Sequence, residues 1–196
     1  RFESRGLGDV YKRQQLEGLK HVTVTQDGFG NLIAKYQNGN SKPRLAFGAH
    51  MDHPAYVRSP ETGELDFLGG VPERFRKKNP PIQEFGDFAM WDLVEWEADG
   101  DRITSRVCDD LIGCAAIVAL FHELDAKEVK ATCYALFTRA EEVGFVGAIH
   151  LAKNWPLPKD VRFVSLETSF PGPGTEMGKG PVIRVGDRMS VFDTAV

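Results

Sequence analysis

Apolar positions along the chain follow two periods, one typical of strands and one typical of helices. Short runs rich in β-branched and aromatic residues indicate buried strands. A turn segment, Asp27 to Asn31, separates the first two of these runs and indicates a hairpin. The strands are predicted at 22–25, 32–36, 44–49, 130–137 and 161–166.

Two stretches between the later strands have helical character. The first, 109–124, begins at an aspartate pair suited to cap a helix and carries the small residues Gly113 to Ala116, which favour close packing on a sheet. The second, 147–154, stops before Trp155-Pro156. Strands that alternate with helices predict an α/β fold, a three-layer α/β/α sandwich around a mostly parallel sheet.

The pattern divides the chain into three parts. Residues 54–105 combine short strand-like pieces with turn residues and no long helix, which predicts a small inserted β-rich subdomain. The catalytic domain is then expected to span 15–53 and 106–196, as a domain truncated at its C-terminus. Residues 1–14 lack periodicity and are predicted to be non-native or disordered.

Composition places the chain among ordinary globular proteins. The 196 residues are 42% hydrophobic and 27% charged, with a net charge of −4, which argues against disordered, collagen-like and coiled-coil classes. No excess of basic groups points to nucleic acid or a membrane surface as a partner. The longest apolar stretch, 113–121, is too short to span a bilayer.

The cysteines and the N-terminus bear on the compartment. The three cysteines are an odd number without a CxxC spacing, which indicates reduced thiols. No apolar secretory segment is visible in the first residues. We therefore expect a cytoplasmic protein.

Acidic and imidazole groups follow three of the predicted strands and begin one helix. Because ligand sites in open α/β sheets lie beyond the carboxyl ends of the strands, these groups are expected to converge. Several carboxylates cannot share a pocket unless a cation neutralises them, and imidazole with carboxylates suits zinc, cobalt or manganese. The candidate residues are His50, Asp52, Asp109, Asp110, Glu141, Glu142 and Glu167.

At these residues the sequence resembles the M42-type metallo-aminopeptidases, within the wider clan of M42, M28 and M20 zinc exopeptidases. The motifs that carry the resemblance are DGFGNLIAKY, FGAHMDHP, RVCDDLIGCAA, FTRAEEVGFVGA and FVSLETS, followed by GKGPVIRVGD. The resemblance implies a zinc-exopeptidase-like fold and an aminopeptidase that removes N-terminal residues from peptides. It also implies two divalent metal ions per subunit, with zinc expected and cobalt or manganese as alternatives, and water activated between them.

The resemblance further implies a role for each candidate residue. His50, Asp109, Glu142 and Glu167 would be metal ligands, with Asp109 bridging the two ions. Glu141 would be the general base, and Asp52 would orient the ring of His50. Glu167 stands where the family usually has Asp, one methylene shorter.

Two alternatives to the aminopeptidase function remain open, and the oligomeric state of the full-length protein can also be predicted. An M20-like carboxypeptidase or N-acyl amino acid deacylase would use the same metal chemistry. The family's last metal ligand is a histidine far downstream, and no histidine follows His150 here, so the chain is expected to be a fragment and a non-catalytic fragment is the second alternative. The family's insertion implies a homo-oligomer for the full-length protein.

Overall fold

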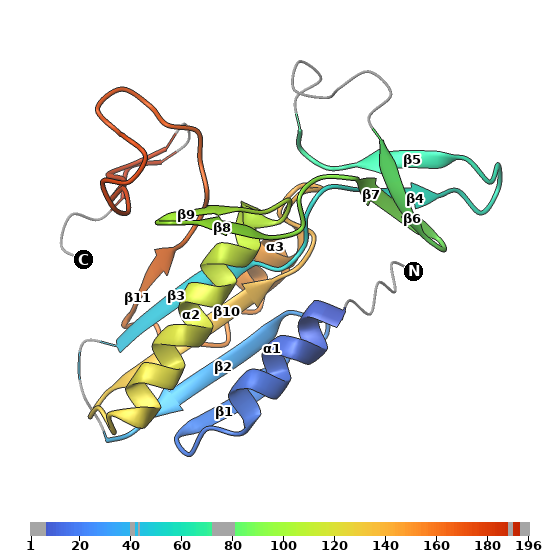
Figure 1. The fold of residues 1–196 in the computed structure, drawn as a ribbon. Coiled ribbons are helices and arrows are strands. Elements are labelled where there is room, and N and C mark those ends of the chain that lie inside the picture. The colour runs from blue at the N-terminus through green and yellow to red at the C-terminus, as the bar shows by residue number, and fades with distance from the viewer. Residues whose placement is uncertain (1–6, 40–41, 43, 72–80, 188–189, 193–196) are drawn as a thin grey trace.

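The structure, a computed structural model, describes residues 7–39, 42, 44–71, 81–187 and 190–192. Its centre is a five-stranded sheet in which each of the five expected strands is present (Figure 1). The strands are β1 (Val22–Gln26), β2 (Leu32–Gln37), β3 (Arg44–His50), β10 (Thr132–Thr138) and β11 (Val161–Ser165), in the order β1-β2-β10-β3-β11.

The central sheet is mixed rather than mostly parallel. β10 and β11 both pair in parallel with β3, whereas β2 pairs antiparallel with β1 and with β10. The hairpin of β1 and β2 forces this, because a tight turn such as Asp27 to Asn31 joins only antiparallel strands. The α/β class is confirmed, and the parallel part is limited to the three strands that lead to the predicted site.

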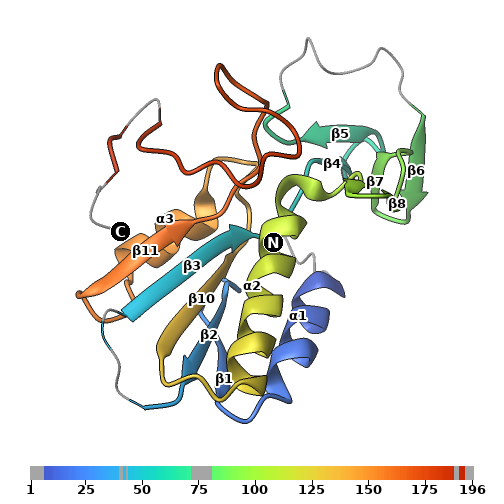
Figure 2. The ribbon, with the colours of Figure 1, turned by 60° about the vertical axis from the view of Figure 1, so that its left-hand side comes forward.

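Helices cover both faces of the sheet, as a three-layer sandwich requires. α1 (Leu7–Glu17) and α2 (Cys108–Ala126) lie on one face, and α3 (Val146–Lys153) lies on the other (Figures 1 and 2). The buried positions of α2 recur every three or four residues and form one stripe toward the sheet. None of the described helices is both long and apolar enough to cross a membrane.

The burial of β10 on both faces explains why its sequence is a continuous apolar run. Its alternate residues Cys133, Ala135 and Phe137 pack into the core beneath α1 and α2. Tyr134 and Leu136 point the other way and join Leu151 of α3 in the second core. A strand that is buried on both faces has no polar side, so the run carries no alternation.

Residues 7–14, part of the segment that was predicted to be non-native or disordered, belong to α1 in the structure. Leu16 near the end of this helix is 1% exposed and packs into the core with α2 and the sheet. Among residues 11–17 the buried side chains are Lys12 and Leu16, and one apolar position gives little periodicity, which is why the sequence pattern missed the helix. Residues 1–6 lie outside the described residues.

Residues between β3 and α2 form sheets of their own. Four strands pair in the order β5-β4-β7-β6, and two further strands form the ribbon β8-β9. This β-rich part lies beyond the edge of the central sheet where β3 ends (Figure 1). The subdomain boundaries at 54 and 105 stay a prediction. The strands are β4 (Ala55–Arg58), β5 (Leu65–Leu68), β6 (Ile82–Phe85), β7 (Phe88–Trp91), β8 (Glu97–Asp99) and β9 (Arg102–Thr104).

Candidate metal centre

The carboxyl ends of the three parallel strands bring the predicted site residues together. His50 is the last residue of β3 and pairs in register with Thr138, the last residue of β10. Glu141 and Glu142 follow β10 directly, and Glu167 follows β11 at the same edge of the sheet. The chain topology thus places groups from distant parts of the sequence at one point.

The ring of His50 is the centre of this cluster. Its side chain is 3% exposed, and its Nδ1 lies 2.8 Å from the backbone carbonyl oxygen of Asp52. A carbonyl oxygen only accepts, so Nδ1 carries the proton and Nε2 faces the acidic groups. Nε2 lies 2.9 Å from Asp109 Oδ1, 3.7 Å from Glu167 Oε2 and 3.8 Å from Glu141 Oε2.

The two aspartates at the start of α2 have different surroundings. Both have non-helical backbone angles, and the peptide bond between them is cis. The side chain of Asp109 is 55% exposed and faces His50. Asp110 is fully buried, where its carboxylate accepts the backbone N–H of Gly113 at 3.2 Å and that of His50 at 3.3 Å. Asp110 therefore caps the helix and ties it to β3.

Asp52 holds the segment that carries the two glutamates. Its carboxylate accepts the backbone N–H of Glu141 at 3.1 Å and that of Glu142 at 3.2 Å. Its Oδ1 lies 3.9 Å from Nδ1 of His50, whereas the short contact to that ring comes from its own backbone carbonyl. The predicted ring orientation is thus provided by the main chain of Asp52, and its side chain positions the glutamate pair instead.

The buried amide of Asn31, to which the sequence analysis gave no role, holds the backbone just before the two glutamates. Asn31 is fully buried; its Oδ1 accepts the backbone N–H of Arg139 at 3.0 Å, and its Nδ2 donates to Asp27 at 2.7 Å and to the Gly147 carbonyl at 3.1 Å. A Cβ on Gly147 would overlap Asn31 and the backbone of Arg139. The Asp27 to Asn31 segment was read as a turn and as part of the DGFGNLIAKY motif, and neither reading gave Asn31 a role.

Burial and neighbouring charges shift the pKa values of the residues in this cluster. Burial raises the pKa of Glu141 to about 7 and that of Asp110 to about 7, and it also raises the pKa of Glu142. Burial by itself would lower the pKa of His50, but hydrogen bonds with Asp109 and Glu167 outweigh it and raise this pKa to about 11. The hydrogen bond from His50 holds the pKa of Asp109 below its usual range. Negative charge is therefore in excess among these described contacts, and the His50 imidazolium offsets part of it.

The donor set fits a divalent cation. Ligand atoms of His50, Glu141 and Glu142 lie within 4.8 Å of one another, and so do those of His50, Asp110 and Glu167. Nitrogen and oxygen donors without a thiolate suit zinc, cobalt or manganese. Because Nδ1 is already engaged, the free lone pair of neutral His50 is on Nε2, which points at the carboxylates.

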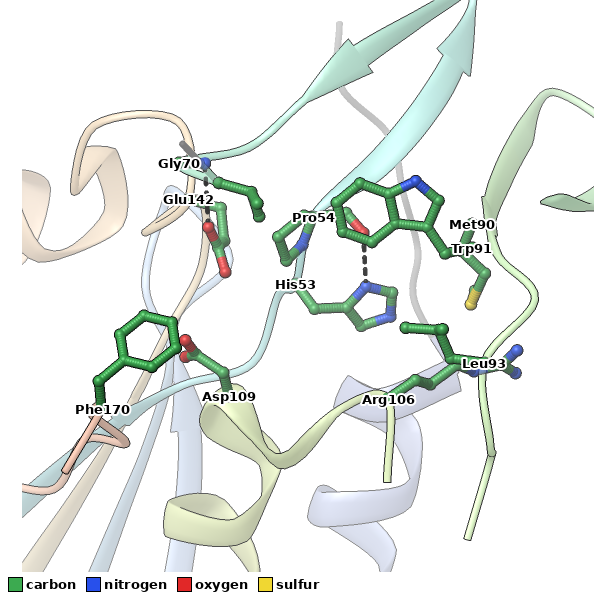
Figure 3. Close-up of a pocket in the computed structure, with 11 residues that line it drawn as sticks. His53, Pro54, Gly70, Met90, Trp91, Leu93, Arg106, Asp109, Glu142 and Phe170 are labelled. Carbon is green, nitrogen blue, oxygen red and sulfur yellow. Dashed lines mark hydrogen bonds between the residues drawn. The ribbon is translucent and has the colours of Figure 1, made fainter. Parts of the chain in front are cut away.

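A cavity of about 340 Å³ opens beside the metal centre, toward the inserted β-rich part. Asp109 and Glu142 lie at one side of it, and Trp91 of β7 lies at the other (Figure 3). The backbone N–H of Gly70 donates to Oε2 of Glu142 at 3.1 Å and links this part to the centre. The cavity therefore connects the acidic cluster with the second sheet.

An α/β/α sandwich with one imidazole and several carboxylates at the carboxyl edge of its sheet fits a metal-dependent hydrolase. The sequence pattern described as M42 glutamyl aminopeptidase matches residues 82–196, more than half of the chain. The chain belongs to the M42 family of metal-dependent aminopeptidases, which hydrolyse peptide bonds.

Solved structures share the fold. The Pyrococcus horikoshii TET1 peptidase, which can assemble into a tetrahedron or a large octahedral shell, aligns with a TM-score of 0.71 at 20% identity, over 94% of this chain and 71% of that one. A TET aminopeptidase from a marine sediment Thaumarchaeota archaeon aligns with a TM-score of 0.64 at 20% identity, over 88% and 65%. The aminopeptidase APDkam598 of Desulfurococcus kamchatkensis gives 0.58 at 20% identity, over 89% and 62%. The alignments include the inserted sheets as well as the central sandwich.

Proposed function

We propose that the chain removes the N-terminal residue of peptides at a centre held by His50, Asp109, Glu142 and Glu167. The observation that supports this most is the surroundings of one atom, Nε2 of His50, which has carboxylates from three separate segments within 4 Å. Two divalent ions are the proposed occupants, with zinc expected and cobalt or manganese as alternatives. Such ions supply Lewis acidity, which polarises a scissile carbonyl and makes water a nucleophile near neutral pH.

Glu141 is the proposed general base. Its side chain is 21% exposed and lies 3.8 Å from Nε2 of His50, while its backbone is held by Asp52. A carboxylate in that position accepts the proton of the attacking water and returns it to the leaving amine. Asp52 and Asn31 act on this step through position alone, because they hold the backbone on either side of Glu141.

We also propose a substrate, a cellular compartment, an oligomeric state and a division into subdomains. The substrate is a peptide with a free N-terminus, and the protein works in the cytoplasm. The full-length protein forms a homo-oligomer, since a TET1 relative is a dodecamer and aligns with this chain at 20% identity with a TM-score of 0.72. The inserted β-rich residues 54–105 form a separate subdomain on the domain spanning 15–53 and 106–196.

A pair of glutamate variants tests the mechanism. In the metal-loaded protein, Glu141→Gln is expected to lower kcat on aminoacyl-arylamides by about 10²–10⁴-fold, because the proton acceptor is lost. The bound metal, measured by elemental analysis, is expected to stay. Glu176→Gln, at an exposed glutamate that does not line the cavity beside the centre, is the matched control and should retain full activity.

The same assay separates the alternatives. Hydrolysis by Glu141→Gln at the unaltered rate would refute the role of Glu141. Faster hydrolysis of N-acyl amino acids than of aminoacyl-arylamides would support the M20-like deacylase. Metal binding without hydrolysis of either class would support a non-catalytic chain.

A further inference from the structure

The cavity beside the metal centre has a composition that selects among substrates. It is continuous with Asp109 and Glu142, and its volume of about 340 Å³ lies at the lower end of the range of roughly 300–1,000 Å³ for small-molecule sites. A space of that size is large enough for one large amino-acid side chain. Building on the aminopeptidase function proposed above, we infer that this cavity receives the side chain of the N-terminal residue and prefers large apolar residues, such as leucine or phenylalanine, over glutamate.

The walls of the cavity are mainly apolar. Trp91 is fixed there by two contacts: its Nε1 donates to the Tyr56 hydroxyl at 3.0 Å, and its ring stacks on Phe67 with centroids 5.2 Å apart. A wall that is already ordered loses little entropy when a ligand binds. The apolar lining residues are Pro54, Val71, Met90, Trp91, Leu93 and Phe170.

The positive charge in the lining is already engaged. Arg106 is the one lysine or arginine among the described lining residues, and its side chain is 14% exposed. Its Nη2 lies 2.9 Å from Glu95 Oε1, and its Nη1 donates to Gln83 at 3.3 Å. In Figure 3 its guanidinium points away from Asp109. Arg106 therefore stabilises the wall of the cavity, and Glu95 compensates its charge.

The described lining residues offer few partners to the carboxylate of a substrate glutamate. The imidazole of His53 lies in the middle of the lining, and its Nδ1 is bound to the Pro54 carbonyl at 3.0 Å (Figure 3). Asp109 and Glu142 lie at the metal side of the cavity, where the proposed ions would compensate their charge. Among the described lining residues, no lysine or arginine is free to pair with a substrate carboxylate, which would lose its hydration there, whereas an apolar side chain loses no hydrogen bond.

A substrate panel measures the preference. The metal-loaded protein is assayed on arylamides of leucine, phenylalanine, alanine, lysine and glutamate. Since apolar pockets discriminate by roughly 10–200-fold per missing methylene, kcat/KM for leucine should exceed that for alanine by at least about 10-fold. It should exceed that for glutamate by about 100-fold or more. A higher kcat/KM for glutamate or lysine than for leucine overturns the inference.

Two neighbouring substitutions locate the preference in the cavity. Leu93 lines the cavity and is 44% exposed, and Val94, which does not line it, is 47% exposed, so both tolerate a lysine. Leu93→Lys should lower the leucine-to-glutamate ratio by about 10-fold, because the new ammonium faces the substrate carboxylate. Val94→Lys should leave the ratio unchanged. Equal ratios in the two variants overturn the placement of the substrate side chain.

A binding measurement keeps this inference separate from the catalytic proposal. Calorimetry on metal-loaded Glu141→Gln compares leucine amide with glutamate α-amide. Tighter binding of leucine amide supports the cavity even if no arylamide is hydrolysed, in which case only the catalytic proposal fails. Equal or tighter binding of glutamate α-amide overturns the inference even if the enzyme is active.

Discussion

Asn31 offers a direct test of how the glutamate pair is positioned. Replacing it by alanine removes one hydrogen bond to the Asp27 carboxylate and two to backbone groups, those of Arg139 and Gly147. A bond to a charged group contributes about 1.5–3 kcal/mol and a neutral one about 1 kcal/mol, and the Gly147 carbonyl left behind is buried. We therefore expect a loss of about 3–5 kcal/mol in the free energy of unfolding. For a chain of this size, that corresponds to a Tm lower by roughly 10 °C.

The effect on catalysis should be separable from the effect on stability. The Arg139 backbone lies two residues before Glu141, so its release displaces the base, and a shift of about 1 Å can cost about 100-fold in rate. At a temperature where Asn31→Ala is fully folded by circular dichroism, kcat should fall by about that factor. Metal content should stay at the wild-type value.

Asn38→Ala is the matched control. Asn38 is 9% exposed and also makes two hydrogen bonds, donating to the Glu128 carbonyl at 2.9 Å and accepting from Lys130 at 2.8 Å. It follows β2, whose end pairs with Thr132 at the start of β10, so it lies at the opposite edge of the sheet from the site. Asn38→Ala should lose about 1–3 kcal/mol and keep its kcat. Equal kcat values for the two variants would refute the positioning role of Asn31.

Three further predictions concern the stability of the core, the binding of metal and the reactivity of the cysteines. Tyr36→Phe should lower the free energy of unfolding by about 1–2 kcal/mol in a denaturant titration, because its hydroxyl bonds two backbone carbonyls at 2.8 and 2.9 Å; an unchanged midpoint would contradict this. Chelation should lower the Tm of the metal-loaded protein and zinc should restore it, whereas Asp109→Ala should show no difference between the two states. At pH 8 a thiol reagent should react rapidly with Cys108 alone, since Cys114 and Cys133 are buried and burial raises the pKa of Cys133 to about 11; three fast thiols in the native state would refute the core packing.

The sequence pattern predicted the elements well where burial decides the structure. β10 was visible as an apolar run because both of its faces are covered, and α2 was visible by its small residues. The aspartate pair that was predicted to cap α2 has non-helical backbone angles, and Asp110 accepts the N–H of Gly113 as a cap does. Its second bond, to the N–H of His50, was not visible in the sequence. Contacts across 60 residues of sequence leave no mark in a local pattern.

The site residues were predicted as a set, while their individual contacts were not. The topology alone brings His50, Glu141 and Glu167 together, because β3, β10 and β11 run parallel and end at one edge. Which atom of Asp52 holds the ring of His50 depends on the path of the main chain after β3. That path places a carbonyl 2.8 Å from Nδ1 and frees the carboxylate for Glu141. Spacing in the sequence cannot distinguish these two uses of one residue.

The charge balance of the cluster links its folding to its function. In the metal-free chain, the His50 imidazolium lies where carboxylates from three segments meet, and it is the one cation that these contacts supply. A divalent ion would compete with that proton for the same nitrogen, because Nδ1 is already bound to the Asp52 carbonyl. Hydrogen bonds hold the surrounding backbone, from Asp110 on α2 and from Asp52 and Asn31 around the glutamate segment. The protein thus keeps the acidic groups in place through hydrogen bonds to the main chain, and a divalent ion would provide the charge that these bonds cannot.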